Sequence, residues 1–237
     1  MIIGPYINSS AVLIGASTGA ALSARIPANV RTAMPLTFGA ASMAMGVVMI
    51  SQVAHMPVMV LASILGALIG ELIGLEGAIG KLGASTKAVI DKVAPAPKGI
   101  TQAEFLEKFV AILVLFGASG TGIFGAMNEG MTGDATILIA KSFLDLFTAA
   151  IFAITLGYSV ATIAVVVLAV QLLLAYGATL IMPLTSVPMI ADFKAVGGLI
   201  MLATGLRISG IKMFPVANML PALVLAMPIT ALWMRVF

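Results

Sequence analysis

The sequence has no cysteine and a single histidine, His55. Without cysteine there is no disulfide framework, no thiolate metal site and no thiol nucleophile, and one histidine leaves most zinc and haem sites short of ligands. Charged residues are scarce, at 9% of the 237 residues, where a soluble domain has about 25%. Because a zinc signature, a serine triad, a P-loop and suitably spaced paired carboxylates are also missing, we expect no enzyme, no metal and no organic cofactor.

Apolar residues dominate what is present, at 61% of the chain with a mean hydropathy of +1.19. No soluble domain of this length could bury so much apolar surface, so we expect an all-α integral membrane protein in a lipid bilayer. The 24 glycines and 16 methionines fit closely packed membrane helices. The net charge of +3 does not indicate a nucleic-acid partner, because its basic residues lie between apolar segments.

About eight segments are long and apolar enough to cross a bilayer within a single transmembrane domain, residues 1–237. They cover residues 2–24, 33–51, 57–75, 109–127, 135–157, 159–181, 195–211 and 214–233. The first lacks a basic region and a cleavage site, so it reads as a span and not as a signal peptide. The loops after the first, third and seventh spans together hold most of the lysines and arginines, while the opposite side has only Lys194 and Arg235, which predicts both termini outside.

Residues 76–108 form the one long polar connection, predicted to be cytoplasmic. Between residues 79 and 93, apolar side chains recur at helical spacing with lysines elsewhere, as in an amphipathic helix on a membrane surface. The segment is either a solvated linker or a surface for regulation or a partner. Residues 94–99 break this helix, and Thr101 with Glu104 resembles a capping box for the next helix.

Three stretches of the chain resemble one another around Gly39, Gly117 and Gly197, which are spaced by 78 and 80 residues. Eighteen residues after each glycine, at Pro57, Ala135 and Pro215, a new apolar segment opens. The pattern predicts repeated three-helix units. The first and third would run in opposite directions, and inverted repeats with broken helices are typical of secondary transporters. Apolar helices also share composition by chance, so coincidence is the alternative.

Residues 116–135, FGASGTGIFGAMNEGMTGDA, concentrate glycine at the end of the fourth span. Glycine weakens a helix interior, so a broken helix is predicted, and freed backbone groups at membrane depth are tolerated where they line a cavity. The alternative is a small-residue packing face followed by a turn. The candidate substrate- or ion-binding residues here are Gly117, Ser119, Gly120, Thr121, Gly122, Asn128 and Glu129.

Two charges lie within the fifth predicted span. Lys141 and Asp145 are four residues apart and so share one helix face. Charged side chains at membrane depth are expensive and usually functional, although a pair that neutralises itself could be structural. They are the strongest candidates for binding a substrate or a coupling ion.

Four further polar residues are weaker candidates for the same site. Glu71 lies beside a double GxxxG face and could carry a proton or lie at the membrane interface. Arg207 could clamp an anion or anchor a span end, and Asn8 and Asn218 could bind a ligand or cap a helix. His55 is expected to be an ordinary interfacial histidine without an acid beside it.

The motifs ASGTGIFGAMNEGMTGD, ILIAKSFLDLFTA and AVGGLIMLATGLRISGIKMFPVANMLPAL resemble the YqgA-type (YdfK-type) family. IGPYINSSAVLIG and VLASILGALIGE fit the same family, so the resemblance covers nearly the whole chain. It implies a multi-pass protein of the bacterial inner (cytoplasmic) membrane, in a family labelled as of unknown function, and implies little about mechanism.

The sequence favours a small secondary transporter that moves a small polar or charged solute with H⁺ or Na⁺. Helix N-termini carry partial positive charge, so an anionic or zwitterionic solute is slightly favoured. A homodimer is expected, with the GxxxG faces as one possible contact. The alternatives are an ion channel and a non-transporting scaffold or regulator that works through the surface helix around Lys87 and Lys92.

Overall fold

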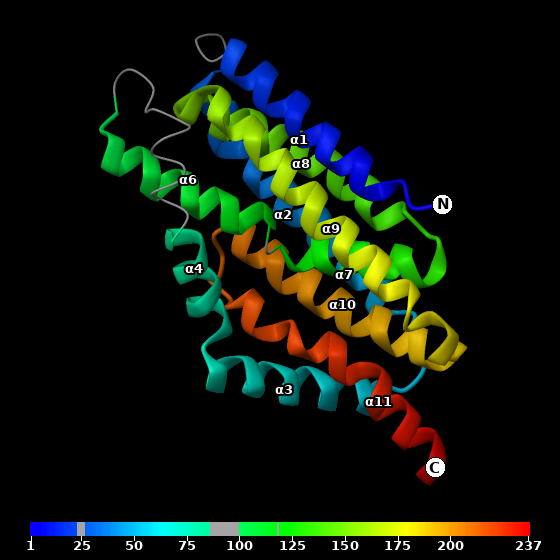
Figure 1. Cartoon of the computed structure of the whole chain (residues 1–237). Helices are drawn as coiled ribbons and strands as arrows, with labels where there is room; N and C mark the ends of the chain where they lie inside the picture. The colour runs from blue at the N-terminus through cyan, green and yellow to red at the C-terminus, as the bar shows by residue number, and fades with distance from the viewer. Residues whose placement is uncertain (23–26, 86–99, 118) are drawn as a thin grey trace. The chain divides into compact units, whose positions relative to one another are not determined.

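The computed structural model describes the chain except residues 23–26, 86–99 and 118. Over these described residues the regular secondary structure consists of helices, with no strand (Figure 1). The α-helices are α1 Gly4–Ala21, α2 Ala28–Ile50, α3 Met56–Ile73, α4 Leu75–Ser85, α6 Gln102–Gly117, α7 Gly120–Thr132, α8 Thr136–Leu156, α9 Ile163–Thr179, α10 Val187–Ile208 and α11 Pro221–Val236. The 3₁₀ helices are η1 Gly157–Thr162, η2 Met182–Leu184 and η3 Val216–Met219.

Six helical stretches among the described residues are long and apolar enough to cross a membrane. One of them, Thr136–Thr179, is 44 residues long and holds α8, η1 and α9. Figure 1 shows the chain turning back at η1, so α8 and α9 run in opposite directions. The helical membrane class is thus confirmed. The eight crossings, their orientation and the sidedness of the termini stay predictions.

Most helix boundaries follow local signals in the sequence. Proline lies in the first turn of α3, where its missing N–H leaves no helical hydrogen bond unmade. α8 begins at Thr136 and η3 at Val216, one residue after the predicted positions Ala135 and Pro215. Gly133 ends α7 with a φ of 74°, a left-handed conformation that only glycine adopts easily. α10 differs from the prediction, because it begins at Val187 and not near residue 195.

The polar connection between α3 and α6 is only partly described. α4 covers its first part, and most of the predicted surface helix, including Lys87 and Lys92, lies outside the described residues. Thr101 Oγ1 accepts a hydrogen bond from the backbone N–H of Glu104 at 3.3 Å. This contact is one half of the predicted capping box, while the Glu104 carboxylate accepts from Lys108.

The chain divides into two units, and the first comprises Met1–Thr32 and Gly77–Gly177. Its core is an apolar cluster from α1, α6, α8, η1 and α9. α1 and α8 run in the same direction and touch at two glycines of α1: Gly15 contacts the backbone of Leu146 and Gly19 that of Ala150. Small residues on α1 allow this close approach, as in other membrane helix pairs.

Substituting Gly15 by alanine is expected to destabilise the first unit. The added Cβ would overlap the backbone oxygen of Leu146, which cannot move like a flexible side chain. Overpacking of this kind costs about 1–3 kcal/mol. Gly80→Ala in α4 is the matched control, since a Cβ there meets nothing within 4 Å. Unfolding of the purified protein in micelles measures both, and equal stability of the two variants would contradict the packing described here.

The second unit comprises Ala33–Glu76 and Ala178–Phe237. α2 and α10 cross in opposite directions at two glycine pairs, Gly39 with Gly205 and Gly46 with Gly198. A Cβ built on Gly46 would lie 2.6 Å from the oxygen of Gly198, and one on Gly198 would lie 2.7 Å from the oxygen of Gly46. The two pairs are therefore nearly symmetric, with the same seven-residue spacing on each helix.

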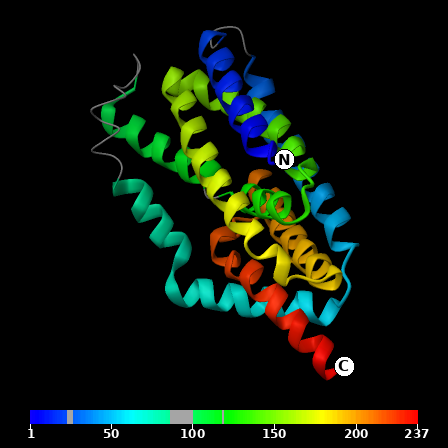
Figure 2. The same cartoon turned by 45° about the vertical axis from the view of Figure 1, so that its right-hand side comes forward.

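α3 and α11 lie side by side in both views (Figure 1 and Figure 2). Gly66 and Gly70 of α3 meet the backbones of Ala222 and Asn218. The GxxxG face of α3 is thus occupied within the same chain. Gly66 and Gly70 are therefore not free for a dimer contact, and the homodimer itself stays a prediction.

Candidate functional site

α8 places the two predicted charges, Lys141 and Asp145, on one buried face. Lys141 is 3% exposed and Asp145 7%, and the lysine ammonium donates to Oδ2 of the aspartate. The spacing of four residues along the helix brings the side chains together, as the sequence predicts. Removing one charge would leave the other unpaired in a low-dielectric interior.

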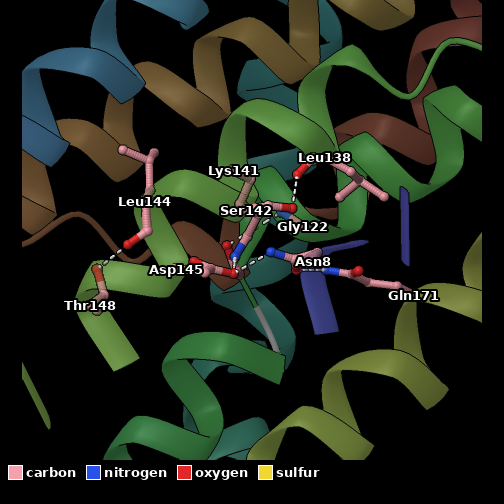
Figure 3. Close-up of polar contacts among 10 residues, drawn as sticks. Asn8, Gly122, Leu138, Lys141, Ser142, Leu144, Asp145, Thr148 and Gln171 are labelled. Carbon is pink, nitrogen blue, oxygen red and sulfur yellow. Dashed lines mark hydrogen bonds and ion pairs between the residues drawn. The ribbon is translucent and has the colours of Figure 1, made fainter. Parts of the chain in front are cut away.

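Asn8 of α1 and Gln171 of α9 extend this ion pair into a chain of side-chain hydrogen bonds (Figure 3). Asn8 Nδ2 donates to Asp145 Oδ2 at 2.8 Å, and Gln171 Nε2 donates to Asn8 Oδ1 at 2.7 Å. Asn8 is fully buried and Gln171 is 2% exposed. We define these four residues, Asn8, Lys141, Asp145 and Gln171, as the polar cluster.

The first turn of α7 lies against the polar cluster. α6 ends at Gly117 and α7 begins at Gly120, with Ser119 as its N-cap, whose Oγ accepts from Gly122 N at 3.3 Å. A Cβ on Gly122 would lie 3.1 Å from Lys141 Cε and 3.3 Å from Gln171 Nε2. Glycine at this position therefore lets the backbone of α7 approach both side chains.

Several groups beside this turn are buried without a hydrogen-bond partner in the described part of the chain. They include Thr121 Oγ1 and Gln171 Oε1. The Lys141 ammonium also lies 5.7 Å from the centre of the Phe116 ring, a contact that stabilises a buried cation. Unpaired buried polar atoms are costly, so these atoms beside a helix N-terminus make this turn the candidate site in the first unit.

Glu129 and Asn128 lie near the other end of α7, where they have structural contacts. Glu129 is buried, and its carboxylate accepts from the backbone N–H groups of Ile3 at 2.7 Å and Gly4 at 3.0 Å. It thus caps the N-terminus of α1. Asn128 Nδ2 donates to the backbone oxygen of Asp134 at 3.2 Å, while its Oδ1 is buried without a partner among the described residues.

Arg207 and Asn218 belong to the second unit, where both bind Glu76. Arg207 Nη1 donates to Glu76 Oε1 at 2.6 Å and to the backbone oxygen of Phe214 at 3.0 Å. Asn218 Oδ1 accepts from Glu76 N at 2.7 Å. Glu71 is exposed on α3. The acid that pairs with Arg207 is therefore Glu76, which the sequence did not single out.

The second unit also holds a buried carboxylate that the sequence analysis missed. Asp192 is fully buried, and its Oδ1 accepts from Ala54 N at 3.0 Å and His55 N at 2.7 Å. Its Oδ2 lies 2.9 Å from His55 Nδ1 and accepts from Thr230 Oγ1 at 3.0 Å. The expectation of a histidine without an acid beside it is therefore wrong. The signal was available, since Asp192 and Lys194 interrupt an otherwise apolar stretch.

Of the predicted site residues, the structure brings together Asn8, Lys141 and Asp145 with the first turn of α7. Within the described residues there is no group of three or more histidines, aspartates or glutamates that could hold a metal ion. The polar cluster therefore has the chemistry of a binding site for charged or hydrogen-bonding groups. It combines one cation, one anion, two amides and a helix N-terminus.

Three comparisons with known proteins bear on this chain. A family model described as protein of unknown function (DUF554) matches residues 3–231. The chain is 56% identical over 98% of its length to "Uncharacterized protein YqgA" of Escherichia coli (strain K12), 98% of which is covered. It is 25% identical over 94% of its length to "Uncharacterized membrane protein YdfK" of Bacillus subtilis (strain 168), 93% of which is covered. No solved structure matches.

Proposed function

The chain belongs to the DUF554 family of membrane proteins of unknown function, and we propose that it is a secondary transporter. It would move a small polar or charged solute, coupled to H⁺ or Na⁺. The observation that carries this proposal is the buried Lys141–Asp145 pair beside the first turn of α7, to which Asn8 donates a hydrogen bond while Gln171 donates to Asn8.

Burial of the Lys141–Asp145 pair costs desolvation free energy, which suggests that the pair has a role besides stability. Two buried charges gain little net stability over apolar residues of the same volume, because desolvation offsets their attraction. Here the pair also accepts a hydrogen bond from Asn8 of α1, which Gln171 of α9 binds in turn, and buried polar atoms beside it have no partner in the described part of the chain. Hydrogen bonds to a buried ion pair also suit a structural role, so it is the unpartnered atoms beside the pair that favour a site that exchanges an ion or solute.

The boundary between α6 and α7 supports the same proposal. Gln102–Thr132 contains a window apolar enough to cross a membrane, yet it holds two helices. We interpret it as one broken membrane helix whose inner N-terminus faces the site. Broken helices of this kind bind anionic groups at their N-termini in known transporters.

The near-symmetric crossing of α2 and α10 supports an inverted repeat in the second unit. A two-fold axis between two antiparallel helices would relate Gly39 to Gly198 and Gly46 to Gly205, and so exchange the two contacting glycine pairs. Inverted repeats accompany alternating access in many carriers. The proposed transporter would therefore combine a site in the first unit with a symmetric helix crossing in the second.

The test is solute flux into proteoliposomes that contain the purified protein. A panel of small amino acids, carboxylates and amines is applied under an imposed H⁺ or Na⁺ gradient. We expect saturable uptake of at least one solute that needs the gradient and falls at least tenfold in Asp145→Asn. Glu104→Gln is the control and should transport normally, because Glu104 is exposed and pairs only with Lys108.

Three outcomes would contradict the proposal. Absence of gradient-dependent uptake of every solute in the panel would reject a carrier for these classes. Single-channel currents would identify an ion channel instead. Full uptake by Asp145→Asn would remove the buried pair from the mechanism and favour a site elsewhere.

A further inference from the structure

The first turn of α7 offers hydrogen-bond donors that the helix itself cannot use. The N–H groups of Gly120 and Thr121 precede the point at which intrahelical bonding begins. Ser119 Oγ accepts only from Gly122 among them. Thr121 adds a buried hydroxyl without a partner in the described chain. A negatively charged group placed here would meet two N–H groups, a hydroxyl and the positive end of the helix dipole.

Lys141 strengthens this donor side. Its ammonium has three hydrogens, and the described hydrogen bond to Asp145 uses one of them. Its Cε lies 3.1 Å from the position that a Cβ would take on Gly122. The ammonium of Lys141 is therefore close enough to the first turn of α7 to add a positive charge to that donor set.

The other side of the site presents a hydrogen-bond acceptor. Its identity follows from the negative charge on Asp145. An ionised carboxylate only accepts, so Asn8 must turn its Nδ2 toward Asp145. Asn8 Oδ1 then faces Gln171 and can only accept, so Gln171 donates with Nε2. The remaining amide atom, Gln171 Oε1, is left as an acceptor, and it is buried without a partner among the described residues.

From this arrangement we propose that the site binds a small amino-acid-like zwitterion. Its carboxylate would occupy the first turn of α7 and the hydroxyl of Thr121. Its ammonium would donate to Gln171 Oε1. The inference rests on the proposed function and names the substrate class of the same site.

A zwitterion fits better than a simple anion or cation. The charges of Lys141 and Asp145 cancel, so the site has no net charge to attract either ion alone. An anion alone would leave Gln171 Oε1 unpaired, and a cation alone would leave the N–H groups of α7 unpaired. The ligand must also be small, because Lys141 Cε and Gln171 Nε2 already lie 3.1 and 3.3 Å from the position of a Cβ on Gly122.

The experiment measures binding of radiolabelled L-alanine to the purified, detergent-solubilised full chain. Unlabelled glycine, acetate and methylammonium serve as competitors. We expect saturable binding that glycine competes strongly, while acetate and methylammonium compete at least tenfold more weakly. Competition by acetate or methylammonium as strong as that by glycine would overturn the zwitterion proposal.

Thr121→Val separates a binding role from a structural one. Valine has the shape of threonine, and it removes a buried hydroxyl that has no partner in the described chain. We therefore expect unchanged or higher thermal stability together with at least tenfold weaker L-alanine binding, and recovery of binding in Thr121→Ser. Thr148→Val is the matched control, because Thr148 donates only to the backbone oxygen of Leu144 and should leave binding unchanged.

Gly122→Val is a second variant that does not depend on the hydroxyl. A larger side chain there would occupy the space beside Lys141 and Gln171 and should abolish L-alanine binding. Unchanged binding in both Thr121→Val and Gly122→Val would overturn the assignment of the site.

The binding and transport experiments can reject the zwitterion proposal and the transporter proposal independently. Saturable L-alanine or glycine binding without any gradient-dependent uptake would keep the zwitterion site and reject the transporter. Gradient-dependent uptake of another solute without L-alanine or glycine binding would keep the transporter and reject the zwitterion.

Discussion

Lys141→Met is expected to lower the free energy of unfolding by about 3–5 kcal/mol, because it leaves a buried charge without its partner. Asp145 would keep only the hydrogen bond from Asn8, and it is 7% exposed. Unfolding in mixed micelles, followed as denaturing detergent is added, measures the loss. The control is Lys108→Met, which removes one partner of an exposed pair and should cost less than about 1 kcal/mol.

The neutral double variant separates stability from function. Lys141→Met combined with Asp145→Asn removes both charges but keeps an acceptor for Asn8 Nδ2. We expect it to recover most of the lost stability, since neutral replacements of buried ion pairs are often tolerated. It should nevertheless show no gradient-dependent uptake. A stable double variant that transports normally would assign the pair a structural role alone.

The sequence predicts well those features that depend on neighbours along the chain. Proline and glycine mark the start of α3 and the end of α7 because each has a specific backbone requirement. The contact between Lys141 and Asp145 follows from the periodicity of one helix. The membrane class follows from composition alone.

The partners contributed by other helices are beyond such reasoning. The sequence does not single out Gln171, because periodicity gives the face of a helix but not the helix that it meets. Its partner, Asn8, is 163 residues away in the sequence. Glu76 was overlooked in favour of Glu71 for the same reason, since nothing local distinguishes the paired acid from the exposed one.

The late predicted start of the seventh span has a different cause. Asp192 and Lys194 were treated as loop residues, since a charge normally ends an apolar segment. In the structure Asp192 lies inside α10 and is satisfied by backbone N–H groups of another segment. A buried charge can therefore lie within a membrane helix when a neighbouring helix N-terminus supplies its donors.

That arrangement predicts the second large effect, in Asp192→Ala. The substitution leaves the N–H groups of Ala54 and His55 without their acceptor at the start of α3. Hydrogen bonds to a charged group contribute about 1.5–3 kcal/mol each, and because Ala54 is exposed and His55 half-buried, water replaces part of them, so the loss should reach about 2–4 kcal/mol. Hydrogen exchange followed by mass spectrometry should show the start of α3 opening first.

Two further variants define the cause of this loss. Asp192→Asn keeps one oxygen acceptor for the two N–H groups and should lose clearly less stability than Asp192→Ala. Glu71→Ala removes an exposed acid from α3 itself and should change stability by less than about 0.5 kcal/mol. If the backbone amides at the start of α3 exchange no faster in Asp192→Ala than in Glu71→Ala, the Asp192 carboxylate does not stabilise that helix terminus. The graded order alanine, asparagine, aspartate is what a carboxylate acting through its two oxygens requires.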